Sequence, residues 1–332
     1  MVSHPEPHPV STLFDIIEGP IRFQLVDWAF RRGVFDACWG GSSAQELAQE
    51  AGLDRSKAAL ALRALAALGL LREANGRFHL ASEVAPYLCR AGDRCLAATF
   101  ASLAEIRHHA LEAFDQVLER SYDVEEEPFG PDHWDRARAS LHAFHRAIAA
   151  DHMLPCLTGL PEWPRARLIL DLGAGSTVLA EEICRAKPEV EVVVFDLPPS
   201  IRQFETSAAA LTLAPGDYTD PASIPEGPFD VIWASMSLYF HNTGLAQLLR
   251  DLAARLSPEG VLVSFHEDLN TARTAPSEHV VGRLMPALTG RDVSFSNGEV
   301  ASAMQSAGLC RISSELRHTP FGLYRLDVGR AP

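Results

Sequence analysis

The segment from Leu168 to Thr177 constrains the fold of this chain more than any other. Its first three residues, Leu-Ile-Leu, form a short apolar run typical of a parallel strand buried on both faces, and a helical pattern begins just after the glycines. Gly173 and Gly175 allow the turn to approach a ligand without an intervening Cβ atom, and free N–H groups face outward where the next helix begins. The segment therefore predicts a strand, a ligand-binding turn and a helix.

Two acids flank this turn. Asp171 ends the first strand, and a second strand, Val190 to Phe195, ends in Asp196, at about the separation expected for an acid that binds a ribose. This arrangement suits a ligand that carries a nucleoside. The usual third glycine is replaced, so an ordinary tight turn between a strand and a helix is the alternative interpretation.

Apolar runs alternate with helical patterns from residue 166 to the end, which predicts a parallel sheet with helices on both faces. The runs expected to form its strands are 168–170, 192–195, 211–213, 231–234 and 261–265. Residues 309–316 and 324–328 are expected to form a terminal strand pair. Ligands of such folds bind at the carboxyl ends of the strands. Converging there we expect Asp171, Asp196, Asp217, residues 235–241 and residues 266–268.

Residues 11–100 have a helical pattern like that of a winged-helix domain. Val10 to Gly33 carries apolar residues at helical spacing, and an apolar helix outside the nucleotide-binding region indicates a subunit interface. A capping box at residues 43–46, a helix cap at Asp54 and an Asn-Gly turn at 75–76 predict two helices and a hairpin. DNA-binding regulators share this order. The second helix is mostly alanine and leucine with few basic residues, so we favour packing over DNA binding.

Residues 101–165 read as a helical connector. Helices are predicted from Thr99 to Arg120 and from Arg136 to Leu154, with an acidic, proline-bounded loop at 123–131 between them. The second helix carries Phe144, His145, His152 and Met153, which we place in a substrate pocket. The alternative is that these histidines lie on the helix surface or in the core. Residues 160–164 are the expected boundary to the next domain.

The net charge, the apolar runs and the cysteines of the sequence limit which partners and which cellular compartment we expect. A formal net charge of −14 argues against binding nucleic acid or an anionic membrane mainly by electrostatics. We find no run of about eighteen apolar residues and no signal peptide at the start, so we expect neither a membrane span nor a leader. The six cysteines are scattered without paired spacing, which favours a reducing cytoplasm.

Taken in order, these motifs resemble the S-adenosylmethionine-dependent small-molecule O-methyltransferases of the caffeate and polyketide-tailoring type. The matching segments are 171–175, 195–198, 216–218, 229–232 and 288–292. The resemblance covers nearly all of the chain. It implies an α/β fold with a Rossmann-like seven-stranded class I methyltransferase domain at 166–332, an N-terminal, mostly α winged-helix dimerisation domain at 1–100, and a connector at 101–165 that contributes to the substrate pocket.

The resemblance also implies a homodimer and S-adenosylmethionine as the cofactor. By similarity, Gly173 and Gly175 would face the methionine part of the cofactor, Asp196 the ribose hydroxyls, and Asp217 with Tyr218 the adenine. Three further positions at the strand ends complete the expected cofactor site: Asp171, Leu197 and Ser235.

The expected catalytic position departs from the family pattern. Tyr239 stands where the family has its catalytic histidine, and His266 stands where it has a glutamate. Tyrosine, with a pKa of about 10, is a poor base at neutral pH but a good hydrogen-bond donor, whereas histidine titrates near neutrality. We hypothesise that His266 is the general base, or His241 if the loop is shifted, with Tyr239 orienting the substrate. The alternative is that both histidines only line the pocket.

The sequence therefore predicts methyl transfer to a small, largely apolar molecule, with a hydroxyl as the expected acceptor, in secondary metabolism such as antibiotic biosynthesis. Two alternatives stay open: an activated carbon as acceptor, with or without a metal, and a family member that has lost methyl transfer. No metal site is predicted, because the spacing of the histidines and acids matches no standard ligand pattern. The pocket candidates are Phe144, His145, His152, Met153, Phe240 and Met285.

Overall fold

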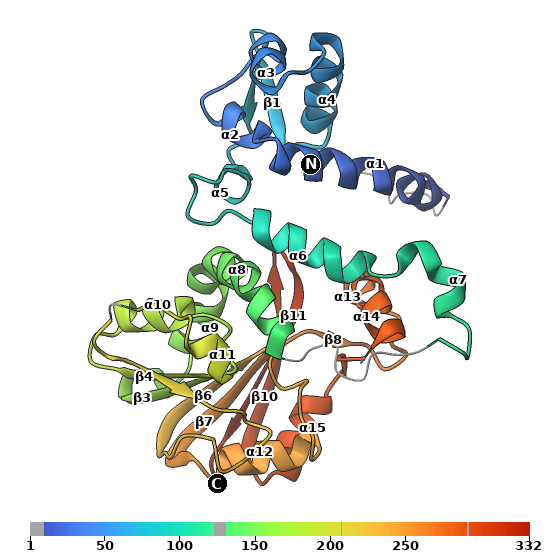
Figure 1. Ribbon diagram of the computed structural model, residues 1–332. Helices are drawn as coiled ribbons and strands as arrows, with labels where there is room; N and C mark the ends of the chain where they lie inside the picture. Colours follow the sequence, from blue (N-terminus) through green and yellow to red (C-terminus); the bar gives the residue numbers. More distant parts are fainter. Residues whose placement is uncertain (1–9, 123–130, 207, 291) are drawn as a thin grey trace, which may run out of the picture. The chain divides into compact units, whose positions relative to one another are not determined.

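The computed structural model in Figure 1 describes residues 10–122, 131–206, 208–290 and 292–332. The chain divides into two compact units, Met1–Ala101 and Ser102–Pro332. The expected N-terminal tail and nearly all of the acidic loop predicted at 123–131 lie outside the described residues.

The first unit consists of one long helix, several shorter helices and a hairpin. Its elements are α1 (Ser11–Arg31), α2 (Val34–Trp39), α3 (Ala44–Ala51), α4 (Arg55–Ala67), β1 (Leu71–Ala74), β2 (Arg77–Leu80) and α5 (Ala85–Leu88). The predicted capping box is present, because Ser43 Oγ accepts from Glu46 N–H at 3.2 Å and Glu46 Oε2 accepts from Ser43 N–H at 2.8 Å. The order helix, helix, hairpin is as predicted.

The boundary of the two units falls within α6 (Ala97–His108), and the second unit continues with η1 (Leu111–Ala113) and α7 (Phe114–Val117). The prediction of one helix from Thr99 to Arg120 is wrong. Ala110 takes a left-handed conformation with a φ of +55°, which ends α6 and starts a new turn.

A second helical series precedes the sheet. It consists of α8 (Pro131–Ile148), the π-helical turn η2 (Ala149–Met153), α9 (Leu154–Thr158) and η3 (Trp163–Arg165). The helix predicted to end at Leu154 therefore widens after Ile148. Pro155 has no N–H to donate to the carbonyl four residues earlier, and the wider turn lies directly before it.

The sheet of the second unit has seven strands in the order β10-β11-β7-β6-β3-β4-β5. The strands are β3 (Leu168–Leu172), β4 (Glu191–Asp196), β5 (Leu211–Pro215), β6 (Phe229–Ser235), β7 (Leu256–His266), β10 (Cys310–Thr319) and β11 (Gly322–Arg330). The first five are parallel, whereas β11 is antiparallel to both β7 and β10. The predicted terminal strand pair is confirmed.

Helices cover both faces of this sheet, as predicted (Figure 1). The helices that follow the first strand are α10 (Val178–Ala186), α11 (Pro198–Ile201), α12 (Leu245–Ala253), α13 (Ser277–Gly282), α14 (Leu284–Thr289) and α15 (Glu299–Ser306). Side chains of η2, α9 and α10 pack with Ile169 and Trp233 on one face, and side chains of α12 and α15 pack with Leu170 and Ile232 on the other. A two-residue pair, β8 (Asp268–Leu269) with β9 (Phe295–Ser296), lies outside the main sheet.

The strand order reverses between β3 and β6, because the chain leaves β3 toward β4 and β5 and then returns to form β6 and β7 on the other side. The crevice at the carboxyl ends of the strands at such a reversal is where open α/β sheets bind ligands. Within the described residues, no helix combines the length and apolar character needed to cross a membrane.

Candidate active site

The glycine turn lies at the carboxyl end of β3, beside the reversal. Gly173 and Gly175 have φ values of +63° and +66°, a region that favours glycine. A Cβ atom on Gly173 would lie 2.7 Å from the Cβ atom of Ser237, which follows β6. Gly173 therefore allows the turn after β3 to pack closely against the segment after β6, whereas a Cβ atom on Gly175 would lie 3.3 Å from His145 of α8.

Asp171 and Asp196 lie on one face of the sheet at this edge. Asp171 is paired with Val194 of β4, and Asp196 follows two residues later on the same face. Asp171 is only 3% exposed, and burial, with the neighbouring Asp196 charge, raises its pKa to about 8. Burial also raises the pKa of Asp196, whose two carboxylate oxygens accept from Gly175 N–H and Leu197 N–H at 2.7 Å each.

Tyr218 and Asp217 follow β5 at the same edge. The Tyr218 hydroxyl donates to the carbonyl of Ser237, and its ring lies 3.4 Å from the place of a Cβ atom on Gly173. Asp217 is exposed, and its Oδ1 accepts from Thr219 N–H at 2.9 Å. Ser235 ends β6, and its buried Oγ atom has no hydrogen-bond partner among the described residues. A buried hydroxyl without a hydrogen-bond partner is suited to form a hydrogen bond with a bound ligand.

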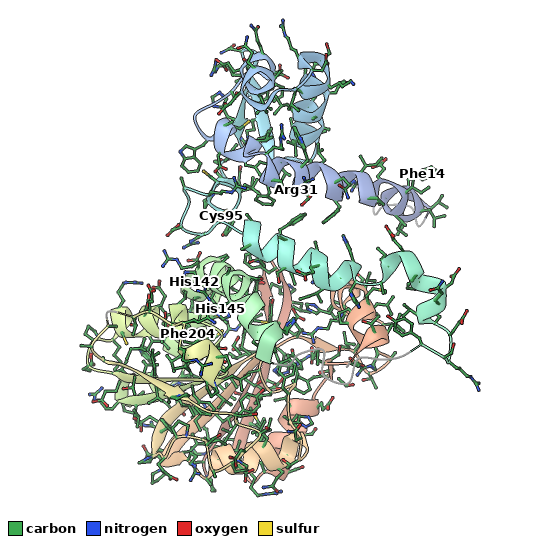
Figure 2. All side chains as sticks on the ribbon, in the orientation of Figure 1. Phe14, Arg31, Cys95, His142, His145 and Phe204 are labelled. Atoms are coloured by element: carbon green, nitrogen blue, oxygen red, sulfur yellow. The ribbon has the colours of Figure 1, made fainter. Side chains whose placement is uncertain are left out.

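Helix α8 closes this edge from one side. His145 is buried, and its Nδ1 atom lies 2.7 Å from Ser176 Oγ in the glycine turn. Burial lowers the pKa of His145 to about 4, so the ring is neutral at physiological pH. Figure 2 shows His142 and His145 on α8 near Phe204, which follows α11. Thr177 occupies the N-cap position of α10, and the Ser176 hydroxyl joins α8 to the turn.

Comparisons with known proteins agree with this geometry. A family model described as a methyltransferase domain matches residues 169–260. The chain is 26% identical over 331 residues to demethylspheroidene O-methyltransferase of Rhodobacter capsulatus, covering 93% of this chain and 79% of the relative. It is 27% identical over 277 residues to 3-hydroxy-5-methyl-1-naphthoate 3-O-methyltransferase of Streptomyces sahachiroi, covering 76% of each. This chain is an S-adenosylmethionine-dependent methyltransferase, similar to O-methyltransferases over most of its length.

The methyltransferase has the fold of its family. The solved structure of human N-acetylserotonin methyltransferase in complex with S-adenosylmethionine superposes with a TM-score of 0.78, 16% sequence identity and 99% of both chains covered. The predicted class I fold is therefore confirmed, and the relatives agree with the expected resemblance.

The residues at the strand ends fit S-adenosylmethionine. The cofactor carries positive charge and hydroxyl groups, and the methyltransferase offers two carboxyl groups, a glycine turn and the unpartnered Ser235 hydroxyl. Gly175, Leu197 and Ser200 do not fill the roughly four acceptor sites of an ionised Asp196. The structure thus brings together the predicted cofactor residues: Asp171, Gly173, Gly175, Asp196, Leu197, Asp217, Tyr218 and Ser235.

Tyr239, at the position of the family histidine, is held in a saturated polar cluster. Its hydroxyl accepts from Glu267 N–H at 3.0 Å and donates to the Glu267 carbonyl at 3.1 Å. Its ring stacks on Phe295 with ring centroids 4.4 Å apart, and the Arg283 guanidinium lies over the Tyr239 ring, 4.8 Å from its centroid. Burial raises the pKa of Tyr239 to about 12, so the hydroxyl stays protonated. The ring orientation is fixed, and the hydroxyl has no free capacity for proton removal.

Arg283, which the sequence did not single out, joins this cluster. Its guanidinium donates from Nε to Glu267 Oε2 at 3.0 Å and from Nη1 to the Val293 carbonyl. His279 faces the same carboxylate through Nδ1 at 3.6 Å, while its Nε2 donates to the Leu323 carbonyl at 2.7 Å. The basic neighbours, together with hydrogen bonding, hold the pKa of Glu267 below its usual range despite burial.

His266, the last residue of β7, is enclosed by Ser264, Asp327 and Phe295. It is 2% exposed, its Nδ1 lies 2.9 Å from Ser264 Oγ, and its Nε2 lies 3.7 Å from Asp327 Oδ2. Burial, with the charges of Arg325 and Arg283, lowers the pKa of His266 to about 3. A ring so enclosed is a poor candidate for taking a proton from a bound molecule.

The remaining predicted residues occupy different surroundings. His241 follows β6 and is half-buried. Phe144 contacts Phe321 at 5.4 Å, and Phe240 contacts Trp134 of α8 at 5.1 Å. His152 is half-buried in the π-helical turn, whereas Met153 is buried in the core that joins η2 to the sheet, and Met285 is buried in α14. No group of three potential ligands, His266 and His279 included, is placed to hold a metal in the described part of the chain.

Sequence reasoning missed two residues of this edge, Trp134 and Arg283, and it placed Ser237 there without a role. Ser237 packs on the glycine turn, Trp134 contacts Phe240, and Arg283 pairs with Glu267. Ser237 lies three residues after the predicted strand 231–234 and within the residues 235–241 expected at this edge, but its packing on the glycine turn was not predicted. No sequence signal marks Trp134 or Arg283, because their contacts depend on distant parts of the chain.

Proposed function

We propose that this methyltransferase transfers a methyl group to a hydroxyl group of a small, largely apolar molecule in secondary metabolism. S-Adenosylmethionine supplies the methyl group already activated on a positively charged sulfur. The observation that carries the proposal is that α8 contacts the glycine turn through His145 and also contributes Phe144 and Trp134 to aromatic pairs near the same sheet edge. Relatives that act on a naphthoate hydroxyl and on acetylserotonin support an aromatic acceptor.

A hydroxyl acceptor must lose its proton during transfer, and the chain offers few groups for this step. Tyr239 is fixed and protonated, and His266 is enclosed with a pKa of about 3. Of the predicted bases, His241 combines a half-buried position with a place in the loop after β6. We therefore propose His241 as the general base, with Tyr239 and Phe240 shaping the acceptor side of the site.

The test is formation of S-adenosylhomocysteine from S-adenosylmethionine with a panel of hydroxylated naphthoates and indoles. His241→Gln should lower kcat by about 10²-fold or more with unchanged cofactor affinity, because only the base is removed. His266→Gln, the matched variant, should retain turnover within a few-fold if it stays folded. A large loss of kcat in His266→Gln with normal turnover in His241→Gln would restore the original hypothesis for His266.

A second candidate function is methylation of an activated carbon. The saturated hydroxyl of Tyr239, at the position where the family carries its base, favours this alternative, since a carbon acid is less dependent on that residue. Nuclear magnetic resonance of the product separates the two, because O-methyl and C-methyl groups differ in chemical shift. Cofactor binding with no product on any acceptor would favour the third alternative, a protein that has lost methyl transfer.

We further propose that the protein is a homodimer in a reducing, cytoplasmic compartment. The support for the dimer is the apolar, exposed first half of α1, where Leu13, Phe14, Ile16, Ile17 and Ile21 are 60–69% exposed. The support for the compartment is that all six cysteines are free.

A further inference from the structure

Asp171 is a buried acid without a cationic partner. It lies in the middle of the sheet, with Trp233 of β6 beside it on one side and Val194 of β4 on the other. Ser235 and Asp196 follow these neighbours by two residues, so all three polar groups share one face. None of the salt bridges found in the described residues includes Asp171 or Asp196.

The groups that face Asp171 do not supply positive charge. From β4 comes Asp196, whose carboxylate is held by Gly175 N–H and Leu197 N–H and repels a second negative charge. From α8 comes His145 in the same turn region, and burial keeps that ring neutral. From β6 come only Trp233 and Ser235. A carboxylate this deeply buried beside another acid is costly to ionise until a cation arrives.

We propose that Asp171 carries a proton in the cofactor-free protein and releases it when the positively charged cofactor binds. In this step the O–H bond of the carboxyl group breaks, the electron pair stays on the oxygen, and the proton passes to the buffer. The protonation state of Asp171 thereby responds to the positive charge of the cofactor, and the affinity of the protein for the charged cofactor depends on pH. The inference rests on the cofactor of the family and concerns how this chain recognises it.

The charge can come from the sulfonium or from the α-ammonium group, and three ligands distinguish these sources. S-Adenosylmethionine carries both, S-adenosylhomocysteine carries only the ammonium, and 5′-methylthioadenosine carries neither. If only S-adenosylmethionine causes proton release on binding, the sulfonium is the charge that deprotonates Asp171. If S-adenosylmethionine and S-adenosylhomocysteine both cause proton release, the ammonium group is that charge. Release by methylthioadenosine would overturn the proposal, because no positive charge enters the site.

The experiment is calorimetric titration at pH 7.0 in phosphate and in Tris, whose ionisation enthalpies differ. The difference in observed enthalpy gives the number of protons released, and we expect roughly one for wild-type protein with S-adenosylmethionine. Asp171→Asn should bind with no proton release, since asparagine imitates the protonated acid. Asp251→Asn on α12 is the matched control, and it should release as wild type does.

A second measurement needs no variant. The Kd of wild-type protein for S-adenosylmethionine should fall by up to about tenfold per pH unit between pH 6.0 and 7.5, where the ligand amine stays mainly protonated. Binding without proton release and without this pH dependence would overturn the inference and leave the cofactor assignment intact. Continued release by Asp171→Asn would overturn it as well. Absence of binding would remove the cofactor assignment, and the inference with it.

Discussion

Asp171 and His145 lie at the same sheet edge, yet burial moves their pKa values in opposite directions. The pKa of the Asp171 carboxyl group is raised to about 8 and the pKa of the His145 imidazole is lowered to about 4, because in each case desolvation disfavours the charged form. At neutral pH both side chains are therefore mainly uncharged in the absence of a ligand. The edge that receives a charged cofactor is built so that its most enclosed groups carry little charge beforehand.

This state of Asp171 has a consequence for stability. A carboxyl group whose folded pKa is raised contributes its full stability below the unfolded pKa of 3.8, and that stability is lost as the pH rises through about 8. The loss is up to about 1.4 kcal/mol per pH unit within that window. Asp171→Asn cannot titrate, so thermal unfolding without cofactor should show its Tm rising relative to wild type between pH 5 and pH 8, then levelling. Parallel Tm curves for the two proteins would contradict the raised pKa.

At the scale of elements, α13 and α14 are fastened to the strand ends through Arg283, which lies between them. Its guanidinium joins the Glu267 carboxylate after β7, the Val293 carbonyl and the ring of Tyr239 after β6. Both side chains of the ion pair are less than one-fifth exposed. Removing one partner would leave the other charge buried and unpaired, which costs more than the pair itself contributes.

Arg283→Met should accordingly lower the free energy of unfolding by about 3 kcal/mol, measured by urea denaturation. Arg273→Met is the matched control, because its ion pair with Asp292 is exposed and should contribute less than about 1 kcal/mol. The loss in free energy of unfolding for Arg283→Lys should lie between those of the two methionine variants, since lysine keeps the charge but lacks the planar guanidinium group. Equal losses in Arg283→Met and Arg273→Met would show that the buried cluster does not fasten α13 and α14.

The elements that the sequence predicted well are those whose signals are local. Strand 168–172, its glycine turn and the capping box at Ser43 depend on residues a few positions apart, and each was found where expected. The break at Ala110 and the π-helical turn before Pro155 were missed, because helical periodicity continues through both. Arg283 and the enclosure of His266 were missed for another reason: their surroundings come from strands and helices that meet only in the folded chain.

At the scale of the whole molecule, the first unit buries apolar side chains of α1 only near the end of the helix and leaves those of its first half exposed. Ala29 and Phe30, near its end, are buried in the core of the first unit, whereas the first half of the helix exposes large aliphatic and aromatic side chains. Figure 2 labels Phe14 near one end of the helix and Arg31 near the other. A helix that is apolar on several sides is stable in water only when another surface covers it. In the proposed homodimer, a second copy of the chain provides that surface without any other partner.

Two acidic substitutions in this face should therefore separate the copies. We expect wild-type protein to elute as a dimer by size-exclusion chromatography with light scattering, and Phe14→Glu with Ile17→Glu to elute as a monomer, because each carboxylate would be buried without a partner in the dimer. Leu316→Glu, at an apolar position on β10 that is 48% exposed, should stay dimeric. Circular dichroism shows whether the variants are folded. If wild-type protein is a monomer at all concentrations, or if the double variant stays dimeric, the apolar face of α1 is not covered by a second copy of the chain.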